Sequence, residues 1–301
     1  MSLNAFSGVR PLFGPSGHSE SYAAEGHVST MDMPAWLAAR GLDIFEYSFG
    51  RGVRISSSSA ADIGAKCDEY GIEMSVHAPY FINFASPEPE KAQNSVNYIL
   101  SSLKILKCFG GERCVFHAGA QGKDSREAAF ARTKDMFRRT LDLVAEENAF
   151  HSLILCPETM GKQAQIGTVE EVIELCKLGD NVYPCVDLGH INALYGGSLK
   201  EAGDFELIVR KLLDGLGEKK TRNMQVHFSK IQYGAKGEIR HLTFADEVYG
   251  PRFEPFAEVI VKYGLTPHIL SESAGTQAED AAVMRDIWKS ELSLKNKASN
   301  A

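Results

Sequence analysis

Several features that mark other classes of protein are missing from this chain. No stretch approaches the roughly 18 consecutive apolar residues of a membrane span, and the opening MSLNAFSGVR lacks the apolar core of a secretory leader, so we expect neither. The chain also has no excess of basic residues: 32 Lys and Arg against 39 Asp and Glu give a formal net charge of −7 and a pI of about 5.8. Any nucleic-acid binding must therefore depend on a local site.

Paired cysteines and glycine-rich loops are missing as well. The six cysteines form no CxxC pair and most lie inside apolar runs, so we interpret them as reduced, buried thiols of a cytoplasmic protein. No glycine-rich phosphate loop follows the first apolar run, which disfavours an open doubly wound sheet, the alternative for a chain of this kind. With 44% hydrophobic and 24% charged residues, the 301-residue chain has an ordinary globular composition.

What the chain does contain is an alternation of short apolar runs with longer amphipathic stretches. In residues 89–110, Val96, Ile99 and Leu103 recur at helical spacing, and Thr168 with Glu171 forms a capping box. The serine-rich segment 54–60 is interpreted as a surface turn. Eight strand–helix units predict an α/β fold, a (β/α)8 TIM barrel in a single domain, residues 1–285, with a polar tail, residues 286–301. The predicted strands are VRPLFG, DIFEYSF, EMSVHAP, RCVFHAG, SLILCPET, YPCVDLGH, MQVHFSK and PHILSES.

Seven side chains of metal-binding types lie at the ends of six of these strands. In a barrel, the carboxyl ends of all strands meet at one face, which holds the active site. A single strand-end histidine is more often structural, but seven such groups together would suffer desolvation and repulsion without a counter-ion. Nitrogen and oxygen donors without thiolate favour Zn²⁺, with Mn²⁺ or Fe²⁺ as alternatives, and seven groups suffice for two ions; a buried polar network is the other interpretation. The seven are His77, His117, Glu158, Asp187, His190, His227 and Glu272.

The loop after the seventh strand, residues 233–246, adds two further candidates. A long loop on the active face can fold back over the site, so His241 and Glu238 could complete a third metal site with His190. The other histidines are given no role in metal binding. His151 and His268 flank the starts of strands and are expected toward the opposite face.

These motifs resemble endonuclease IV, the zinc-dependent apurinic/apyrimidinic endonuclease family within the xylose-isomerase-like TIM barrels. HAPYFINFAS is similar to the family's most specific signature, and four shorter segments follow in the same order over about residues 40–280. The resemblance implies a phosphodiester hydrolase of DNA base excision repair, in which a metal-bound hydroxide attacks the phosphate 5′ of an abasic site. It also implies duplex DNA as partner, and we expect a monomer. The four segments are FHAGA, PETMGK, CVDLGH and ILSES.

The resemblance also implies a ligand set for two or three zinc ions. The first ion is assigned to His77, His117 and Glu158, and the second to Asp187, His227 and Glu272 with Glu158 as bridging and catalytic residue. The third is assigned to His190, His241 and an acid. The family's acid stands two residues before that histidine, where this chain has Ile239, and Glu238 is one residue further back. This offset predicts a third site that is weaker or differently metallated.

The segments expected to contact DNA are only partly present. Tyr80 and Phe81 keep the aromatic and hydrophobic pair that the family inserts into the minor groove, with packing at the barrel rim as the alternative. The family's NPRQW-like loop after the second strand is replaced by EYSFGRGVRISSS, in which Arg51 and Arg54 are the candidate substitutes for its arginine.

Two other functions stay open at this point. A divalent-metal sugar isomerase or epimerase of the xylose-isomerase-like class, with a small sugar as substrate, would share the fold, and Glu46 at the end of the second strand fits that class. A non-catalytic metal-dependent binding protein would keep the metals without turnover. The number of metals separates the isomerases from the nuclease, since the isomerases use fewer metals and fewer histidines.

Overall fold

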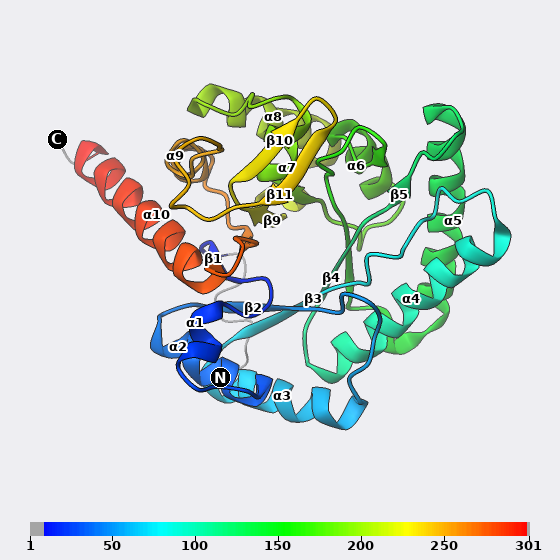
Figure 1. Cartoon of the computed structure of the whole chain (residues 1–301), viewed down its shortest axis with the longest axis horizontal. Helices are drawn as coiled ribbons and strands as arrows, with labels where there is room; N and C mark the ends of the chain where they lie inside the picture. Colours follow the sequence, from blue (N-terminus) through cyan, green and yellow to red (C-terminus); the bar gives the residue numbers. More distant parts are fainter. Residues whose placement is uncertain (1–8, 300–301) are drawn as a thin grey trace.

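Eight parallel strands form the centre of the computed structural model, which describes residues 9–299 (Figure 1). Hydrogen bonding connects them in two runs, β1-β12-β9-β8 and β2-β3-β4-β6. Isolated parallel bridges, Ser16 to Glu46 and Glu158 to Cys185, join the two runs and close the barrel. The predicted TIM barrel is confirmed. Its strands are β1 (Leu12–Pro15), β2 (Ile44–Ser48), β3 (Glu73–His77), β4 (Arg113–Phe116), β6 (Ile154–Pro157), β8 (Cys185–Asp187), β9 (Gln225–Phe228) and β12 (His268–Ser271).

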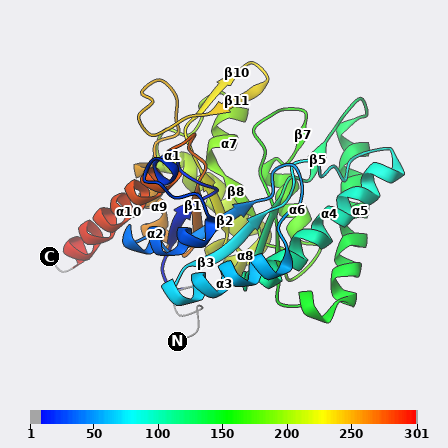
Figure 2. The same cartoon turned by 60° about the horizontal axis from the view of Figure 1, so that its bottom comes forward.

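Helices surround the barrel and cover its apolar outer face (Figures 1 and 2). The helix predicted from apolar spacing buries Val96, Ile99 and Leu103, and the predicted capping box is present, with Glu171 N donating to Thr168 Oγ1 at 3.2 Å. Two 3₁₀ turns, Thr30–Asp32 and Asn148–Phe150, complete the connections. The helices are α1 (Glu20–Ala24), α2 (Met33–Ala39), α3 (Ser57–Tyr70), α4 (Pro89–Cys108), α5 (Arg126–Glu146), α6 (Val169–Cys176), α7 (Leu188–Leu194), α8 (Ala202–Arg222), α9 (Glu254–Tyr263) and α10 (Gln277–Ser299).

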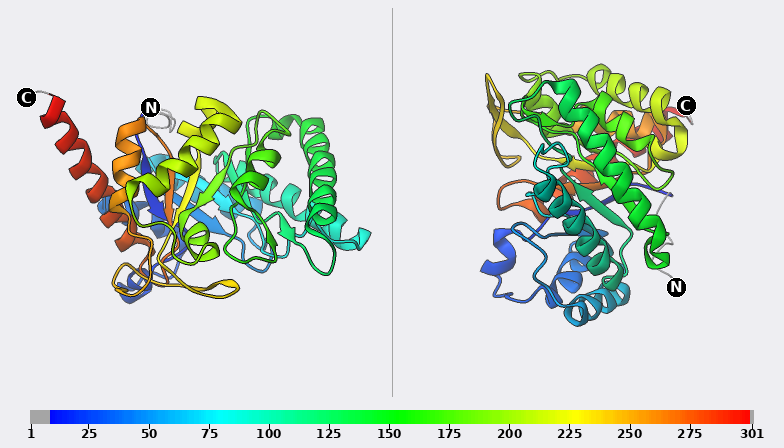
Figure 3. Two further views of the ribbon diagram at one scale, coloured as in Figure 1. Left: turned by 90° about the horizontal axis from the view of Figure 1, so that it is seen from above. Right: turned by 90° about the vertical axis from the view of Figure 1, so that its right-hand side faces the viewer.

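Two segments differ from the sequence interpretation. The serine-rich segment is the first turn of α3, because Ser56 is its N-cap and accepts a hydrogen bond from Ser59 N at 3.1 Å. The boundary predicted at residue 286 does not break the structure, since α10 continues to Ser299 and Trp288 is buried against Phe13. Figure 3 shows α10 extending away from one side of the barrel; residues 300 and 301 of the predicted tail lie outside the described residues.

A two-stranded hairpin, β10 (Ile231–Gly234) and β11 (Gly237–His241), lies over the carboxyl ends of the barrel strands (Figures 2 and 3). It is part of the loop predicted to fold back over the site. The hairpin packs closely on the segment after β6: Glu238 N donates to Gly161 O at 2.9 Å. Gly237 has a φ of +95°, and a Cβ there would lie 2.1 Å from Gly161 O, so glycine permits this approach. A second short pair, β5 (Gly119–Ala120) and β7 (Gln165–Ile166), lies beside it.

Among the described helices, none combines the length and the apolar character that crossing a membrane requires.

Candidate metal centre

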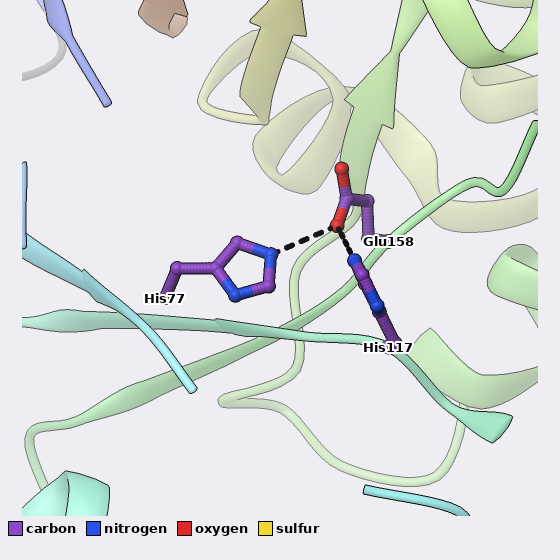
Figure 4. Close-up of side chains that lie close together, drawn as sticks. All are labelled: His77, His117 and Glu158. Atoms are coloured by element: carbon purple, nitrogen blue, oxygen red, sulfur yellow. Dashed lines mark hydrogen bonds and ion pairs between the residues drawn. The ribbon is translucent and has the colours of Figure 1, made fainter. Parts of the chain in front are cut away.

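The seven predicted side chains converge where the barrel strands end, together with Glu238 and His241 from the hairpin. Glu158, which follows β6, lies at the centre and is completely buried. Its Oε2 atom is 3.2 Å from His77 Nε2 and 3.0 Å from His117 Nε2 (Figure 4). The three donor atoms thus face one another as a first group that could hold a metal ion.

The other oxygen of Glu158 faces a second group. Glu158 Oε1 lies 3.0 Å from His227 Nδ1, which is 3.5 Å from Glu272 Oε1. Asp187 completes the group, and its two oxygens differ. Oδ1 accepts a hydrogen bond from the backbone N of His190 at 2.7 Å, whereas the buried Oδ2 has no hydrogen bond within residues 9–299 and lies 3.3 Å from His190 Nδ1 as an ion-pair contact. A buried carboxylate oxygen without a hydrogen bond is costly, and a cation would satisfy it.

A third group joins the hairpin to the barrel. His190 Nε2 lies 3.4 Å from Glu238 Oε2, and His241 Nε2 lies 3.9 Å from Glu238 Oε1. In each of the three groups, the donor atoms lie within 4.8 Å of one another. The third group therefore forms despite the unusual spacing between Glu238 and His241.

A β-bulge explains how this spacing is accommodated. Gln232 pairs with Arg240 and Tyr233 pairs with Glu238, so Ile239 is an extra residue of β11 without a partner on β10. Residues three apart on a regular strand face opposite sides, but one bulged residue brings them back to the same side. Ile239 points to solvent, with 57% of its surface exposed. The bulge removes the geometric reason for expecting a weaker third site.

We expect Glu238→Gln to remove one bound metal equivalent of about three and to leave the other two in place, because an amide cannot supply the charge of the third group. The matched control is Arg240→Gln on the same strand, whose exposed side chain bonds Gln232 instead of the site. Elemental analysis of the purified variants measures the stoichiometry. Three equivalents retained in Glu238→Gln would show that Glu238 is not a ligand.

Each histidine has a second ring nitrogen besides the one that faces its metal group, here called the far nitrogen. Hydrogen bonds to the far nitrogens hold four of the imidazoles in place. His77 Nδ1 donates to Ala78 O at 2.8 Å, and His190 Nδ1 donates to Thr159 O at 2.9 Å. The remaining two contacts pair Ser229 Oγ with His241 Nδ1 at 2.9 Å, and Glu46 with His227 Nε2 at 3.0 Å. Such contacts fix which nitrogen carries the proton and turn the other toward a metal.

The carboxylates and imidazoles of the centre shift one another's pKa values strongly. Burial lowers the pKa of His77, but Glu158 and the neighbouring carboxylates outweigh it and raise that pKa to about 9. Asp187 and Glu158 likewise overcome burial and raise the pKa of His190 to about 9. Burial alone would raise the pKa of Glu158, yet His227 and the neighbouring imidazoles hold that pKa well below its usual value. Divalent cations would replace the protons of these imidazoles as counter-charges, so the donor set fits them.

At two other groups, burial outweighs the neighbouring charges in setting the pKa. It lowers the pKa of His117, despite the nearby Glu158, and it raises the pKa of Asp187 to about 6. An imidazole that loses its proton easily and a carboxylate that is costly to leave charged without a cation are both ready to bind one.

A cavity of about 250 Å³ opens above the three groups. Lys162, at 3.6 Å from Glu238 Oε1, is the one lysine or arginine that lines it within the described chain. Tyr80 also lines the cavity, whereas Phe81 stacks against Tyr80 with a ring-centroid distance of 4.5 Å; each is 48% exposed. Packing at the rim therefore leaves half of this aromatic pair free for a ligand.

The two candidate arginines differ in their surroundings. Arg51 Nε donates to the hydroxyl of Tyr80 at 3.0 Å, which places its guanidinium beside the cavity. Both arginines are exposed, and neither is among the residues that line the cavity described for residues 9–299, so the contact with Tyr80 is what distinguishes Arg51. Of the two, Arg51 is positioned to contact a ligand at the centre.

Comparison with known proteins decides the family. Residues 34–287 match the family model described as xylose isomerase-like TIM barrel. The chain belongs to this family. An uncharacterized protein of Methanocaldococcus jannaschii is 34% identical over 244 residues, 80% of this chain and 84% of its own length. A probable endonuclease 4 of Aquifex aeolicus is 26% identical over 180 residues, 58% of this chain and 62% of the relative.

Solved structures of other proteins share the fold. Endonuclease IV from Thermus thermophilus superposes with a TM-score of 0.68 at 18% identity, covering 94% of this chain and 99% of its own. A D-tagatose 3-epimerase-like protein gives a TM-score of 0.66 at 20% identity, covering 86% and 91%. The resemblance to endonuclease IV is confirmed at the level of family, and the fold alone does not separate the two activities.

Two polar residues of this family member's site were not predicted from the sequence. Lys162 is the first, and the signal available for it was its place at the end of the PETMGK segment. Glu46 was considered only as a feature of sugar isomerases. The structure places it below the metal groups, in contact with His227. A glutamate inside an otherwise apolar strand, IFEYS, was the available signal, because such a residue is rarely buried without partners.

Proposed function

We propose that this protein hydrolyses phosphodiester bonds with two or three divalent cations, chiefly Zn²⁺, held by the three groups at the mouth of the barrel. The observation that carries the proposal is the position of Glu158, whose Oε2 faces His77 and His117 while its Oε1 faces His227. One carboxylate shared between two sets of nitrogen donors suits a pair of cations acting on one phosphate. When bound, such cations activate water near neutral pH and stabilise charge on the phosphoryl oxygens.

Residues of the chain would orient the attacking water and bind the substrate. Glu158 stays ionised because its pKa is held low, so it can share its charge between two groups and orient the attacking water. Lys162 brings a positive charge to the cavity for a substrate phosphate. The exposed faces of Tyr80 and Phe81 offer apolar surface to an unstacked nucleotide step.

We propose duplex DNA containing an abasic site as the substrate, with cleavage 5′ of that site. The support is the family relationship together with the third group, His190, Glu238 and His241, which sugar isomerases with fewer metals and histidines would not need. The net charge of −7 gives no general attraction to DNA, so binding would depend on the cations and on Arg51 and Lys162.

The decisive assay uses a labelled duplex with one tetrahydrofuran abasic analogue, with and without a chelator, beside a panel of ketoses and aldoses. Nicking 5′ of the analogue that the chelator abolishes is the expected result. Fully metallated protein that interconverts sugars and leaves the duplex intact would instead establish the epimerase function.

Arg51→Ala is expected to weaken both duplex binding and cleavage and to reduce the slope of log K against log salt by about one, as for a lost phosphate contact. Arg54→Ala is the matched control, because Arg54 is equally charged and exposed, whereas it is Arg51 that hydrogen-bonds Tyr80 at the edge of the cavity. Binding titrations at several salt concentrations measure the effect. Equal behaviour of both variants and the unmodified protein would remove Arg51 from the DNA contact.

A further inference from the structure

Glu46 is a completely buried carboxylate that belongs to none of the three metal groups. It lies on β2, inside the barrel and one layer below the centre. Its Oε1 atom accepts from Ser16 Oγ at 2.8 Å and lies 3.0 Å from His227 Nε2. Its Oε2 atom accepts from Ser75 Oγ at 3.2 Å and from Gln225 Nε2 at 3.1 Å.

These contacts argue against Glu46 as a metal ligand. Both of its oxygens are already engaged by donors from β3 and β9 and by Ser16 next to β1, so binding a cation would require breaking them. The sugar-isomerase interpretation, in which a glutamate at this place serves the metal directly, does not match this geometry. The carboxylate faces the far side of His227 instead.

The partner of His227 also differs from those of the neighbouring imidazoles. The far nitrogens of His77 and His190 hydrogen-bond backbone carbonyls, and that of His241 hydrogen-bonds a hydroxyl. The carboxylates that also lie near two of them, Asp187 at 3.3 Å from His190 Nδ1 and Glu272 at 3.9 Å from His241 Nδ1, belong to the second metal group. Of the four, His227 is the one whose far nitrogen hydrogen-bonds a carboxylate outside the three metal groups, and both partners are fully buried. A buried carboxylate is retained at a cost in desolvation, which indicates a specific demand at His227.

We propose that Glu46 is a positioning residue for His227 and sets the affinity of the second metal group. Glu46 accepts a hydrogen bond from Nε2–H of His227. It thereby holds the imidazole in the tautomer whose Nδ1 faces Glu158 and Glu272. A carboxylate behind a ligating imidazole also makes the ligating nitrogen more basic. The inference rests on the proposed metal centre, but it does not depend on which substrate the centre acts on.

The test compares Glu46→Gln and Glu46→Leu with Ser75→Ala, which removes a buried hydrogen bond to the same carboxylate without touching His227. Zinc affinity is measured by competition with a chromogenic chelator. Glu46→Gln, which keeps the volume and an acceptor oxygen but not the charge, is expected to weaken the second group about 10-fold, and Glu46→Leu about 100-fold, whereas Ser75→Ala stays within about 3-fold. The near-isosteric glutamine variant carries the test if the leucine variant does not fold.

A second measurement separates positioning from general stability. In zinc-loaded protein labelled with ¹⁵N-histidine, His227 is expected to show an exchange-protected Nε2 proton, which shifts in Glu46→Gln and stays unchanged in Ser75→Ala. Zinc affinity and His227 resonances that are equal in all variants would overturn the role of Glu46 alone. A wild-type protein that binds no divalent metal would overturn this inference together with the metal centre, and a metal-binding protein that fails to nick DNA would overturn only the proposed function.

Discussion

Glu158→Gln is expected to lower turnover by about 10³-fold or more, at the upper end of the loss seen when one preorganised electrostatic group is removed. The physical reason is that the two oxygens of Glu158 face different histidine sets, and an amide has neither the charge nor the second acceptor oxygen to serve both. The fold should persist, because glutamine has nearly the same volume. Circular dichroism and the melting temperature check the fold, and single-turnover kinetics on the abasic duplex measure the rate.

The same substitution at the start of β3 provides the control. Glu73 lies at the start of that strand, toward the opposite end of the barrel from His77, and burial raises its pKa to about 7. Glu73→Gln therefore changes a partly buried carboxyl of similar size without touching the centre, and its activity should equal that of the unmodified protein. Unchanged activity in Glu158→Gln would contradict the bridging role.

Removal of the metals is expected to have the second largest effect. Protein made without added metal should carry at least two equivalents, chiefly zinc, and a chelator should abolish activity and lower the melting temperature. Zinc at about a thousand times its dissociation constant would stabilise the folded state by about 4 kcal/mol. Elemental analysis finding less than one equivalent would refute the metal centre.

The stability of the metal-free protein should depend on pH in a defined direction. The pKa of His77 and of His190 rises from the ordinary 6.5 to about 9 on folding, so the folded state binds protons that the unfolded state has already released. This contribution to stability is complete below pH 6.5 and is lost as the pH rises through about 9. We expect the melting temperature of the metal-free protein to fall between pH 6.5 and pH 9, and added zinc to reverse the fall. A melting temperature that rises over this range would contradict it.

The pattern of the strands made much of this arrangement predictable. His77, His117, Glu158 and Asp187 each stand at a strand end in the sequence, and the parallel barrel brings all strand ends to one face, so their convergence follows from fold class alone. The sequence could not predict which way a polar side chain in the interior of a strand points. Whether Glu46 points into the barrel beneath His227 depends on the contacts of three other strands, which no local pattern contains.

The hairpin of β10 and β11 shows a second limit to prediction from the sequence. The prediction of a weaker third site followed from the one-residue offset of Glu238 from the position of the family's acid, where this chain has Ile239. The bulge depends on how β11 pairs with β10 and on how Gly237 packs against Gly161, both of which are contacts between segments distant in sequence. The polar composition of residues 286–299 likewise gave no sign that they continue α10 and bury Trp288.

The bulge at Ile239 has a consequence for tracing this site through related proteins. An insertion or deletion of one residue in a hairpin normally exchanges the two faces of a strand, and a ligand pair would be lost. Here the added residue is expelled into solvent, so a change in chain length leaves the arrangement of donors intact. A search pattern with a fixed interval between the acid and the histidine would discard such chains as lacking a third site. Relatives with an interval of two or of three residues are therefore expected to bind the same number of metals.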